Sequence, residues 1–290
     1  MEKKVMNKLE IMVKPPVVQE SWGGFAASIV GMEHVRSELP CQDASAVVCA
    51  PRAAAIVCDG AGSAVRSHDG AKAAVAAFKR GLGLFEPWFA QCLDESTMPT
   101  DVAGYYWHYI CEWLVRAMEE SKLELVREQG GMEKDYDYTV AFVVTGKAFC
   151  GFFQIGDGMI IAGTDNALQT VFAPEKGQFV NETQFLRVGM GCRRKFKAEI
   201  MPRGLVDRVA ITSDGPTKLL FDMKSNEPSK LFCNFFKDVK EGALDRADLC
   251  KFLTCRKWSE IGAEDDKSLA LLAVVDTRPE GKDHRTTTIA

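Results

Sequence analysis

Residues 139–158 read TVAFVVTGKAFCGFFQIGDG, two apolar runs separated by a short break at Gly146 and Lys147. Valine, isoleucine, threonine and phenylalanine favour strands, and a short turn between two such runs predicts an antiparallel hairpin. Other runs of the same kind predict further strands at residues 18–31, 44–50, 53–60, 159–163, 168–173, 196–202, 208–215 and 268–275.

Helices are predicted on both sides of the hairpin. Over residues 71–82, apolar side chains recur every three or four positions, which places them on one helix face. A longer helix is expected to begin with Thr100 or Asp101 as its cap, and its charged end, residues 122–128, is expected to lie in solvent. Residues 216–260 are expected to be helical in pieces.

The order of these elements sets the fold class. Strands, helices, more strands, a second helical region and a last strand follow one another without regular β-α-β alternation, so an α+β fold is predicted. One domain over residues 20–276 is the economical interpretation, after an N-terminal extension at residues 1–19. Residues 174–195 show little periodicity and are predicted to form a functional loop, and the polar residues 277–290 a disordered tail.

Composition and charge exclude several classes of function. A net charge of −4 provides no basic surface for nucleic acid or an anionic membrane. The start of the chain carries scattered charges, unlike a secretory signal, and no run reaches the roughly 18 apolar residues of a membrane span. The ten cysteines form no CxxC pair and the four histidines no HExxH motif, which favours buried free thiols in a reducing cytoplasm over disulfides or a zinc site.

Aspartates stand at the ends of the predicted strands. Asp59, Asp157 and Asp214 each follow an apolar run and precede a glycine, whereas Asp43 and Asp265 come just before a strand. A single Asp-Gly pair is commonly a turn, and Asp157 is the most open to that interpretation because a hairpin could end there. If these ends converge, their carboxylates form an all-oxygen site that needs cations to be tolerable, and Mg²⁺ or Mn²⁺ suits such ligands.

The same stretches, in the same order, resemble the motifs of the metal-dependent Ser/Thr protein phosphatases of the type-2C (PPM) family, especially its compact prokaryotic members. The resemblance covers roughly residues 20–276 and implies two antiparallel β-sheets packed as a sandwich flanked by helices. It also implies a metal-dependent phosphatase acting on phosphoserine and phosphothreonine in proteins. The matching stretches are PCQDA (40–44), AIVCDGAGSA (55–64), YDYTVAFVV (136–144), QIGDG (154–158), VAITSDG (209–215) and DDKSLALLAVV (265–275), with GQFVNETQFL (177–186) resembling a substrate-side segment.

Carried over by position, the resemblance implies ligands for two divalent cations, Mn²⁺ or Mg²⁺. Asp59 would bridge the two ions, and the carbonyl group of Gly60 would bind one of them. Asp214 and Asp265 would hold the other ion. Asp43 would act mainly through a metal-bound water molecule.

A looser third ion is implied between Asp157 and Asp214. For the last motif, Asp266 is the alternative to Asp265, which fits the family pattern better. Two adjacent cations lower the pKa of a bridging water, so no covalent phosphoenzyme is needed. A cysteine phosphatase is disfavoured because no arginine stands six positions after Cys41 or Cys58.

The chain departs from the family pattern where the phosphate is held. Many members have an arginine at the position of Glu38, and eukaryotic members have a histidine at the position of Ala61. Without that histidine, protonation of the leaving group falls to metal-bound water or to another residue. An arginine suits phosphate by its planar fork. The candidate substrate contacts are Arg36, His34 and Ser63.

Two alternatives belong to other classes. One is a catalytically silent phosphoprotein-binding module of the same fold, suggested by Glu38 and by Gln42, which stands where many members have glutamate. The other is a structural subunit, which predicts no metal binding. An active enzyme ranks first because all the ligand aspartates are present. The resemblance also implies a phosphoprotein substrate and an opposing Ser/Thr kinase as partner.

Overall fold

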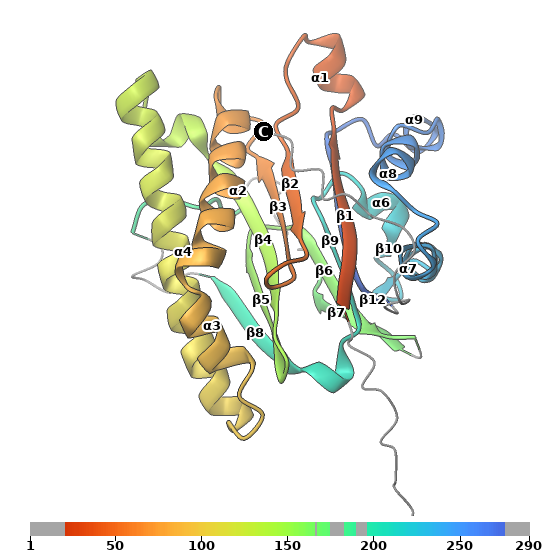
Figure 1. The fold of residues 1–290 in the computed structure, drawn as a ribbon. Helices are drawn as coiled ribbons and strands as arrows, with labels where there is room; N and C mark the ends of the chain where they lie inside the picture. The colour runs from red at the N-terminus through yellow and green to blue at the C-terminus, as the bar shows by residue number, and fades with distance from the viewer. Residues whose placement is uncertain (1–20, 166, 175–182, 190–195, 276–290) are drawn as a thin grey trace, which may run out of the picture.

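The computed structural model describes residues 21–165, 167–174, 183–189 and 196–275. Its long strands form two five-stranded antiparallel sheets (Figure 1). The first, called the β1 sheet, has the spatial order β1 (Ser21–Ile29), β12 (Lys267–Val275), β9 (Arg208–Thr212), β6 (Met159–Thr164) and β7 (Ala167–Phe172). The second, called the β3 sheet, has the order β2 (Ala44–Val48), β3 (Ala54–Gly60), β4 (Tyr138–Thr145), β5 (Phe149–Ile155) and β8 (Lys197–Pro202).

Helices lie on the outer face of each sheet (Figure 1). The β3 sheet is covered by α2 (Ser67–Leu84), α3 (Glu86–Leu93) and α4 (Thr100–Gln129). The β1 sheet is covered by α6 (Thr217–Leu220), α7 (Leu231–Glu241), α8 (Arg246–Leu253) and α9 (Lys257–Glu260). Short elements connect the rest: α1 (Met32–Arg36), η1 (Glu133–Tyr136), η2 (Arg203–Leu205) and the pair β10 (Phe221–Asp222) and β11 (Glu227–Pro228).

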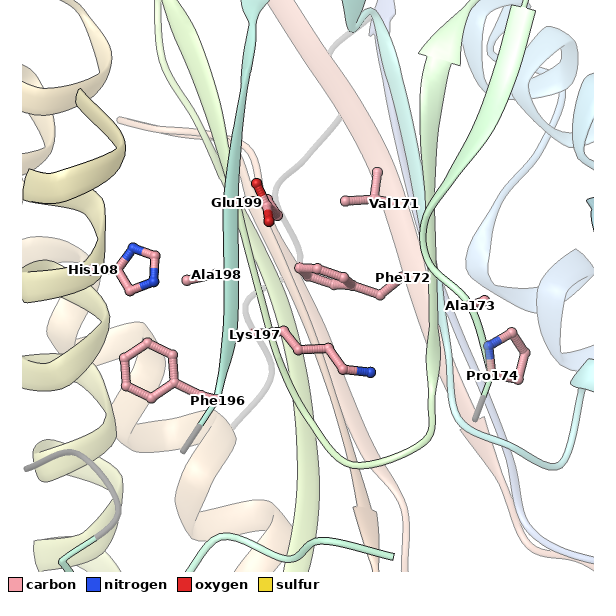
Figure 2. A pocket seen from close by; sticks show the side chains of 9 residues that line it. All are labelled: His108, Val171, Phe172, Ala173, Pro174, Phe196, Lys197, Ala198 and Glu199. Atoms are coloured by element: carbon pink, nitrogen blue, oxygen red, sulfur yellow. The ribbon is translucent and has the colours of Figure 1, made fainter. Parts of the chain in front are cut away.

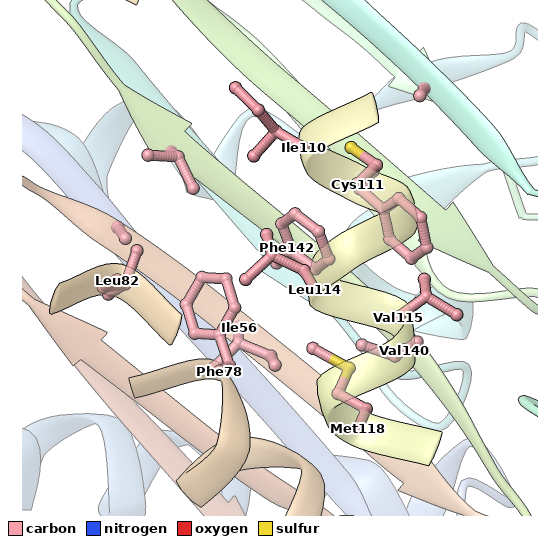
Figure 3. Close-up of a cluster of buried hydrophobic side chains, with 14 of the residues drawn as sticks. Ile56, Phe78, Leu82, Ile110, Cys111, Leu114, Val115, Met118, Val140 and Phe142 are labelled. Atoms are coloured by element: carbon pink, nitrogen blue, oxygen red, sulfur yellow. The ribbon is translucent and has the colours of Figure 1, made fainter. Parts of the chain in front are cut away.

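The two faces of each central strand enter different cores. In β4, Val140 and Phe142 pack under the helices, whereas Ala141 and Val143 face the other sheet. This alternation follows from the two-residue period of an extended chain. Phe78 of α2 meets Phe142 with ring centroids 4.9 Å apart (Figure 3). Replacing Phe142 by alanine would cost about 3–5 kcal/mol of stability, as for other buried phenylalanines.

The predicted fold class is confirmed, with two packed antiparallel sheets and flanking helices. The hairpin at Gly146 and Lys147 is confirmed by the pairing of β4 with β5. The short helices α1 and α3 were not predicted, because neither is long enough to show a clear period. The predictions for residues 1–19 and 277–290, and for most of the loop 174–195, fall outside the described residues.

Two details of α4 differ from the prediction. The helix begins at Thr100 with Pro99 as its N-cap residue, and no side chain caps it, so neither Thr100 nor Asp101 has that role. Of the charged residues expected in solvent, Glu124, Arg127 and Glu128 are exposed, whereas Lys122 is fully buried where α4 packs against η1 and Tyr138 of β4. A charged residue is rarely buried without a partner, and Lys122 has two.

The nine cysteines in the described part of the chain are free thiols. Cys58, Cys92, Cys111 and Cys150 are buried, and the others are partly or fully exposed, so the expectation of buried thiols holds for only some of them. Within the described residues, none of the helices combines the length and apolar character that crossing a membrane requires.

Candidate active site

The aspartates at the strand ends gather at one end of the two sheets. Asp43 precedes β2 and Asp59 ends β3, and these strands pair antiparallel with Ala44 opposite Cys58. Asp265 precedes β12 and Asp214 follows β9, and these two strands also pair antiparallel. Because antiparallel pairing sets the start of one strand beside the end of the next, each sheet contributes neighbouring carboxylates.

Asp157 lies where the chain passes from one sheet to the other. It follows β5 of the β3 sheet and precedes β6 of the β1 sheet, so it is not the turn of a hairpin. The Oγ1 atom of Thr183 donates a hydrogen bond to its Oδ2 atom at 2.8 Å. The turn interpretation of this Asp-Gly pair is therefore wrong.

The carboxylates interact electrostatically across the two sheets. Burial raises the pKa of Asp59 well above its usual range, and the charges of four other aspartates raise it further. Like charges at close range disfavour ionisation, so these carboxylates lie close enough to feel one another. The four partners, in order of effect, are Asp43, Asp214, Asp157 and Asp265.

Asp43 is almost completely buried, with 5% of its surface exposed. Burial raises its pKa to about 7, even though the hydroxyl of Ser213 donates a hydrogen bond to its Oδ2 atom at 2.8 Å. The amide of Ser268 in turn donates to the Ser213 Oγ atom at 2.9 Å. The chain from Ser268 through Ser213 thereby fixes the orientation of the Asp43 carboxylate.

Asp214 differs from Asp43 because the residue as a whole is exposed, although dense packing surrounds its carboxyl group. That packing, followed by the charges of Asp157 and Asp265, raises the pKa of Asp214 to about 6. A hydrogen bond with the side chain of Asp59 opposes the rise. One proton can thus be shared between Asp59 and Asp214, as expected for crowded carboxyl groups.

Asp265 and Asp266 have different surroundings. Asp266 is 3% exposed, and its two carboxylate oxygens accept the amides of Gly31 at 2.6 Å and Gln42 at 2.5 Å. Its Oδ1 atom also lies 3.0 Å from Nδ1 of His34. Asp265 is exposed, and its Oδ1 atom accepts the amide of Asp266 at 2.8 Å. Asp266 therefore holds two loops, whereas Asp265 faces outward.

Gly60 stands where no other residue would fit. A Cβ atom added there would lie 2.7 Å from the Gln42 carbonyl oxygen and 2.8 Å from the Cβ atom of Ser67. The close approach brings the loop after β3 against the loop that carries Gln42 and Asp43. The glycine thus allows both loops, and their carboxylates, to share one small volume.

The candidate substrate contacts lie around this cluster. Arg36 is in α1, which stands beyond the ends of the strands (Figure 1), and its guanidinium binds Glu264 through two hydrogen bonds of 2.8 and 2.9 Å. His34 is on the same helix beside Asp266. Ser63 is exposed in the loop between β3 and α2. Glu38, at the family's arginine position, is exposed with a φ of +55°.

Sequence reasoning missed several residues that support the cluster. Ser213 directly precedes Asp214 in the sequence, but nothing in the pattern indicates that its hydroxyl binds Asp43. Lys267 is 3% exposed, and its Nζ atom donates to the backbone carbonyl of Asp265 at 2.7 Å. Its burial has no signal in the sequence, because it is the first residue of β12 and directly follows the acidic motif.

The side chains of the acidic cluster are of the kind that binds divalent cations, but their positions in the described part of the structure do not form a metal site. As the side chains stand in the described ranges, no group of three or more His, Cys, Asp or Glu residues has the arrangement that a metal ion requires. Oxygen donors from carboxylates are nevertheless the ligands that Mg²⁺ and Mn²⁺ prefer. Burial raises the pKa values of Asp43 and Asp214 most, and the charges of neighbouring aspartates raise them further, so protons or cations would stabilise the cluster.

A separate cavity of about 710 Å³ opens elsewhere in the molecule, beside α4 and the edge strands β7 and β8 (Figure 2). Its lining includes His108, Phe172, Phe196, Lys197 and Glu199, and it includes none of the coupled aspartates. The cavity therefore does not mark the acidic cluster.

Comparisons with known proteins agree on one family. The family model described as protein phosphatase 2C matches residues 30–254. The chain is 27% identical over 264 residues to serine/threonine-protein phosphatase 3 of Escherichia coli (strain K12), covering 87% of this chain and 98% of that protein.

Solved structures share the fold at low sequence identity. The catalytic domain of the serine/threonine protein phosphatase PstP, in complex with two manganese ions, matches with a TM-score of 0.55 and 15% identity over 89% of this chain and 100% of that one. The phosphatase Stp1 from Staphylococcus aureus matches with a TM-score of 0.52 and 12% identity over 88% and 95% of the two chains.

Proposed function

Because the chain belongs to the protein phosphatase 2C family and is a metal-dependent protein serine/threonine phosphatase, we propose that the acidic cluster at the strand ends is its active site. The observation that carries this proposal is the electrostatic coupling of Asp59 to four carboxylates drawn from both sheets. So many carboxylates in one place are stable as anions only beside cations. A purely structural role would not require this crowding.

We propose the cation ligands by their positions in the family's motifs, and the electrostatic interaction of these carboxylates supports the assignment. Divalent cations bound there would supply an activated water and would neutralise the phosphoryl oxygens during in-line attack. Asp59 lies at the centre of the coupled group and would bridge two ions. The other ligands would be Asp43, the carbonyl of Gly60, Asp214 and Asp265, with Asp157 and Asp214 holding a looser third ion.

Asp265 is preferred over Asp266 as a ligand because of their hydrogen bonds. Both oxygens of Asp266 are occupied by the amides of Gly31 and Gln42. Asp266 thus positions the loop that carries Asp43. Asp265 is exposed, and the described contacts engage only its Oδ1 atom, through a backbone amide.

Asp43 is held as a proton acceptor for a water molecule. The side chains of Ser213 and Ser268 both donate hydrogen bonds that favour the ionised carboxylate, and in this form Asp43 can accept a hydrogen bond from water in the site. The pKa of about 7 makes Asp43 half ionised near neutral pH in the absence of cations. Positive charge nearby would favour the ionised form and hence this role.

Arg36, His34 and Ser63 are the proposed phosphate contacts. The ion pair of Arg36 with Glu264 is solvent exposed, with 60% of the arginine side chain accessible. Such exposed pairs contribute little stability because water screens the two charges, so Arg36 can leave Glu264 for a phosphate dianion at small cost. His34 is less free because it lies against Asp266.

The proposed phosphatase activity implies a substrate, a partner enzyme, a cation and a cellular compartment. The substrate would be a protein carrying phosphoserine or phosphothreonine, and a Ser/Thr kinase would supply it within a signalling pathway. Either Mn²⁺ or Mg²⁺ would serve, since both accept carboxylate ligands. The nine free thiols among the described residues favour the reducing cytoplasm as the working compartment.

Hydrolysis of a phosphothreonine peptide by the metal-free protein, before and after addition of Mn²⁺, tests the proposal. We expect no turnover in EDTA and restored turnover with Mn²⁺. The silent phosphoprotein-binding module, suggested by Glu38 and Gln42, predicts peptide binding without turnover under both conditions. Full turnover after exhaustive chelation would refute the assignment of the aspartates as cation ligands.

A further inference from the structure

A second cluster of charged residues lies next to the acidic site. Lys122 of α4 is fully buried, and its Nζ atom lies 2.5 Å from Oδ1 of Asp137. The same Nζ atom donates to the backbone carbonyl of Leu186 at 2.8 Å and lies 3.6 Å from Oε1 of Glu133. We call Lys122, Asp137 and Glu133 the Lys122 clamp.

The clamp and its neighbours hold residues 183–188 in place through several contacts. Glu133 accepts the amide of Val188 at 2.7 Å, and the amide of Leu186 donates to the carbonyl of Tyr138 at 2.8 Å. Leu186 is itself fully buried in the core under α4. Arg187 adds an ion pair to Asp137 at 3.5 Å. The segment is thus fixed by charge, by backbone hydrogen bonds and by an apolar anchor.

Both ends of this arrangement reach the acidic site. Thr183, at the start of the held segment, donates to the carboxylate of Asp157 at 2.8 Å. The backbone carbonyl of Asp137 accepts the amide of Ala61 at 2.9 Å, in the loop that follows Asp59 and Gly60. One residue of the clamp therefore contacts the loop of the bridging aspartate, and the held segment contacts Asp157.

We propose that the Lys122 clamp is a positioning device: it fixes residues 183–188 so that Thr183 orients Asp157 toward Asp214. This inference rests on the proposed function, since Asp157 matters there as a ligand of the looser third ion. In this proposal Lys122, Asp137 and Glu133 are positioning residues and have no direct part in binding the substrate. They act through Thr183, whose hydroxyl occupies one carboxylate oxygen of Asp157 and leaves the other for a cation.

The composition of the clamp supports a positioning role over simple stabilisation. A buried ion pair adds little net stability compared with apolar residues of the same size, because both charges lose their hydration. The lysine ammonium group has three donors and binds a carboxylate and a carbonyl at the same time. It thereby fixes the positions of Asp137 and Leu186 relative to each other. A methionine at position 122 would fill the space but would bind neither acceptor.

The test compares variants of the clamp with a matched control. Lys122→Met removes the central charge, and Arg52→Met removes a similarly buried charge that binds Glu86 and Asp94 near the opposite end of β3 from Asp59. Both substitutions should lower the melting temperature. Only Lys122→Met should weaken the lowest-affinity Mn²⁺ site, by about 10- to 100-fold in calorimetric titration of the metal-free protein.

Two further variants cover the case in which Lys122→Met fails to fold. Glu133→Ala changes a residue whose side chain is 34% exposed, and Thr183→Val removes only a hydroxyl. Each should weaken the same Mn²⁺ site, and Glu133→Ala should also speed hydrogen exchange of the Leu186 amide. Combining Glu133→Ala with Thr183→Val should weaken Mn²⁺ binding no more than the stronger single change, because both act through Asp157.

Two results would contradict the proposed role of the Lys122 clamp. Mn²⁺ binding by Glu133→Ala and Thr183→Val within twofold of wild type would overturn it, and so would independent, multiplying effects in the double variant. If wild-type protein bound no Mn²⁺, the proposed function would fail, and the positioning of Asp157 for a cation with it. Exchange of the Leu186 amide would still show whether the clamp orders residues 183–188.

Discussion

The hydroxyl of Ser213 donates a 2.8 Å hydrogen bond to Asp43, a residue 170 positions earlier in the chain. The bond joins the residue after β9 of one sheet to the residue before β2 of the other. Since Ser213 precedes Asp214 directly, the same short segment carries one aspartate of the acidic cluster and the hydroxyl that supports another.

Replacing Ser213 by alanine should shift the pH dependence of activity. The hydrogen bond favours ionised Asp43 and lowers its pKa, so its loss should raise that pKa further. We expect the acidic limb of kcat/KM to move upward by about one pH unit. A pH profile of peptide hydrolysis measures the shift, and identical limbs in variant and wild type would exclude this role for Ser213.

The metal-free protein should lose stability relative to Asp43→Asn as pH rises. The pKa of Asp43 is about 7 in the folded protein and near its ordinary value in the unfolded chain. Between these values the folded state binds more protons, so the stability from protonated Asp43 is present at low pH and is lost as pH rises through 7.

From pH 5 to pH 8 the free energy of unfolding of the wild type should fall by roughly 2–3 kcal/mol relative to that of Asp43→Asn. Urea unfolding in EDTA at several pH values measures it. Parallel stability curves for wild type and Asp43→Asn would show that Asp43 titrates at its ordinary pKa.

Asp59→Asn and Asp214→Asn should abolish most of the stabilisation by Mn²⁺. A ligand that binds only the folded state at a hundredfold excess over its Kd adds about 2.7 kcal/mol of stability. Thermal melts with and without Mn²⁺ should show this gain for wild type and much less for both variants. Asp238→Asn, on α7 and outside the coupled group, is the control and should keep the full gain.

Arg36→Ala should raise KM for a phosphopeptide while leaving Mn²⁺ affinity unchanged. One charge-assisted hydrogen bond is worth about 1.5–3 kcal/mol, so kcat/KM should fall roughly ten- to a hundredfold. Glu264→Gln is the informative companion, because it frees Arg36 from its partner and should lower KM. Unaltered kinetics in both variants would leave the phosphate contact to His34, Ser63 or the cations.

The sequence predicted the strands and the acidic motifs because both depend on local patterns. The run from Thr139 to Gly158 carries its own hairpin signal, and the Asp-Gly pairs stand out after apolar runs. The order of strands within each sheet does not follow from local pattern. It depends on which apolar faces meet, and this arrangement sets Asp157 at a crossing between sheets and not in a turn.

The supporting contacts were beyond prediction for a related reason. Lys122 stands in a charged run that is typical of a solvated helix end, yet it is buried because the chain after α4 turns back to place Asp137 beside it, and the carbonyl of the distant Leu186 meets it as well. Asp266 resembles Asp265 in the sequence and differs only in its partners, the amides of Gly31 and Gln42. Such tertiary pairings have no signature in spacing.

A crystal structure of the protein soaked in Mn²⁺, with anomalous scattering recorded at the manganese edge, tests the central claim most directly. We expect two strong anomalous peaks bridged by Asp59, with Asp214 and Asp265 on one ion, and a weaker third peak beside Asp157. Manganese bound away from Asp59 and Asp214, or bound only at the surface, would contradict the account.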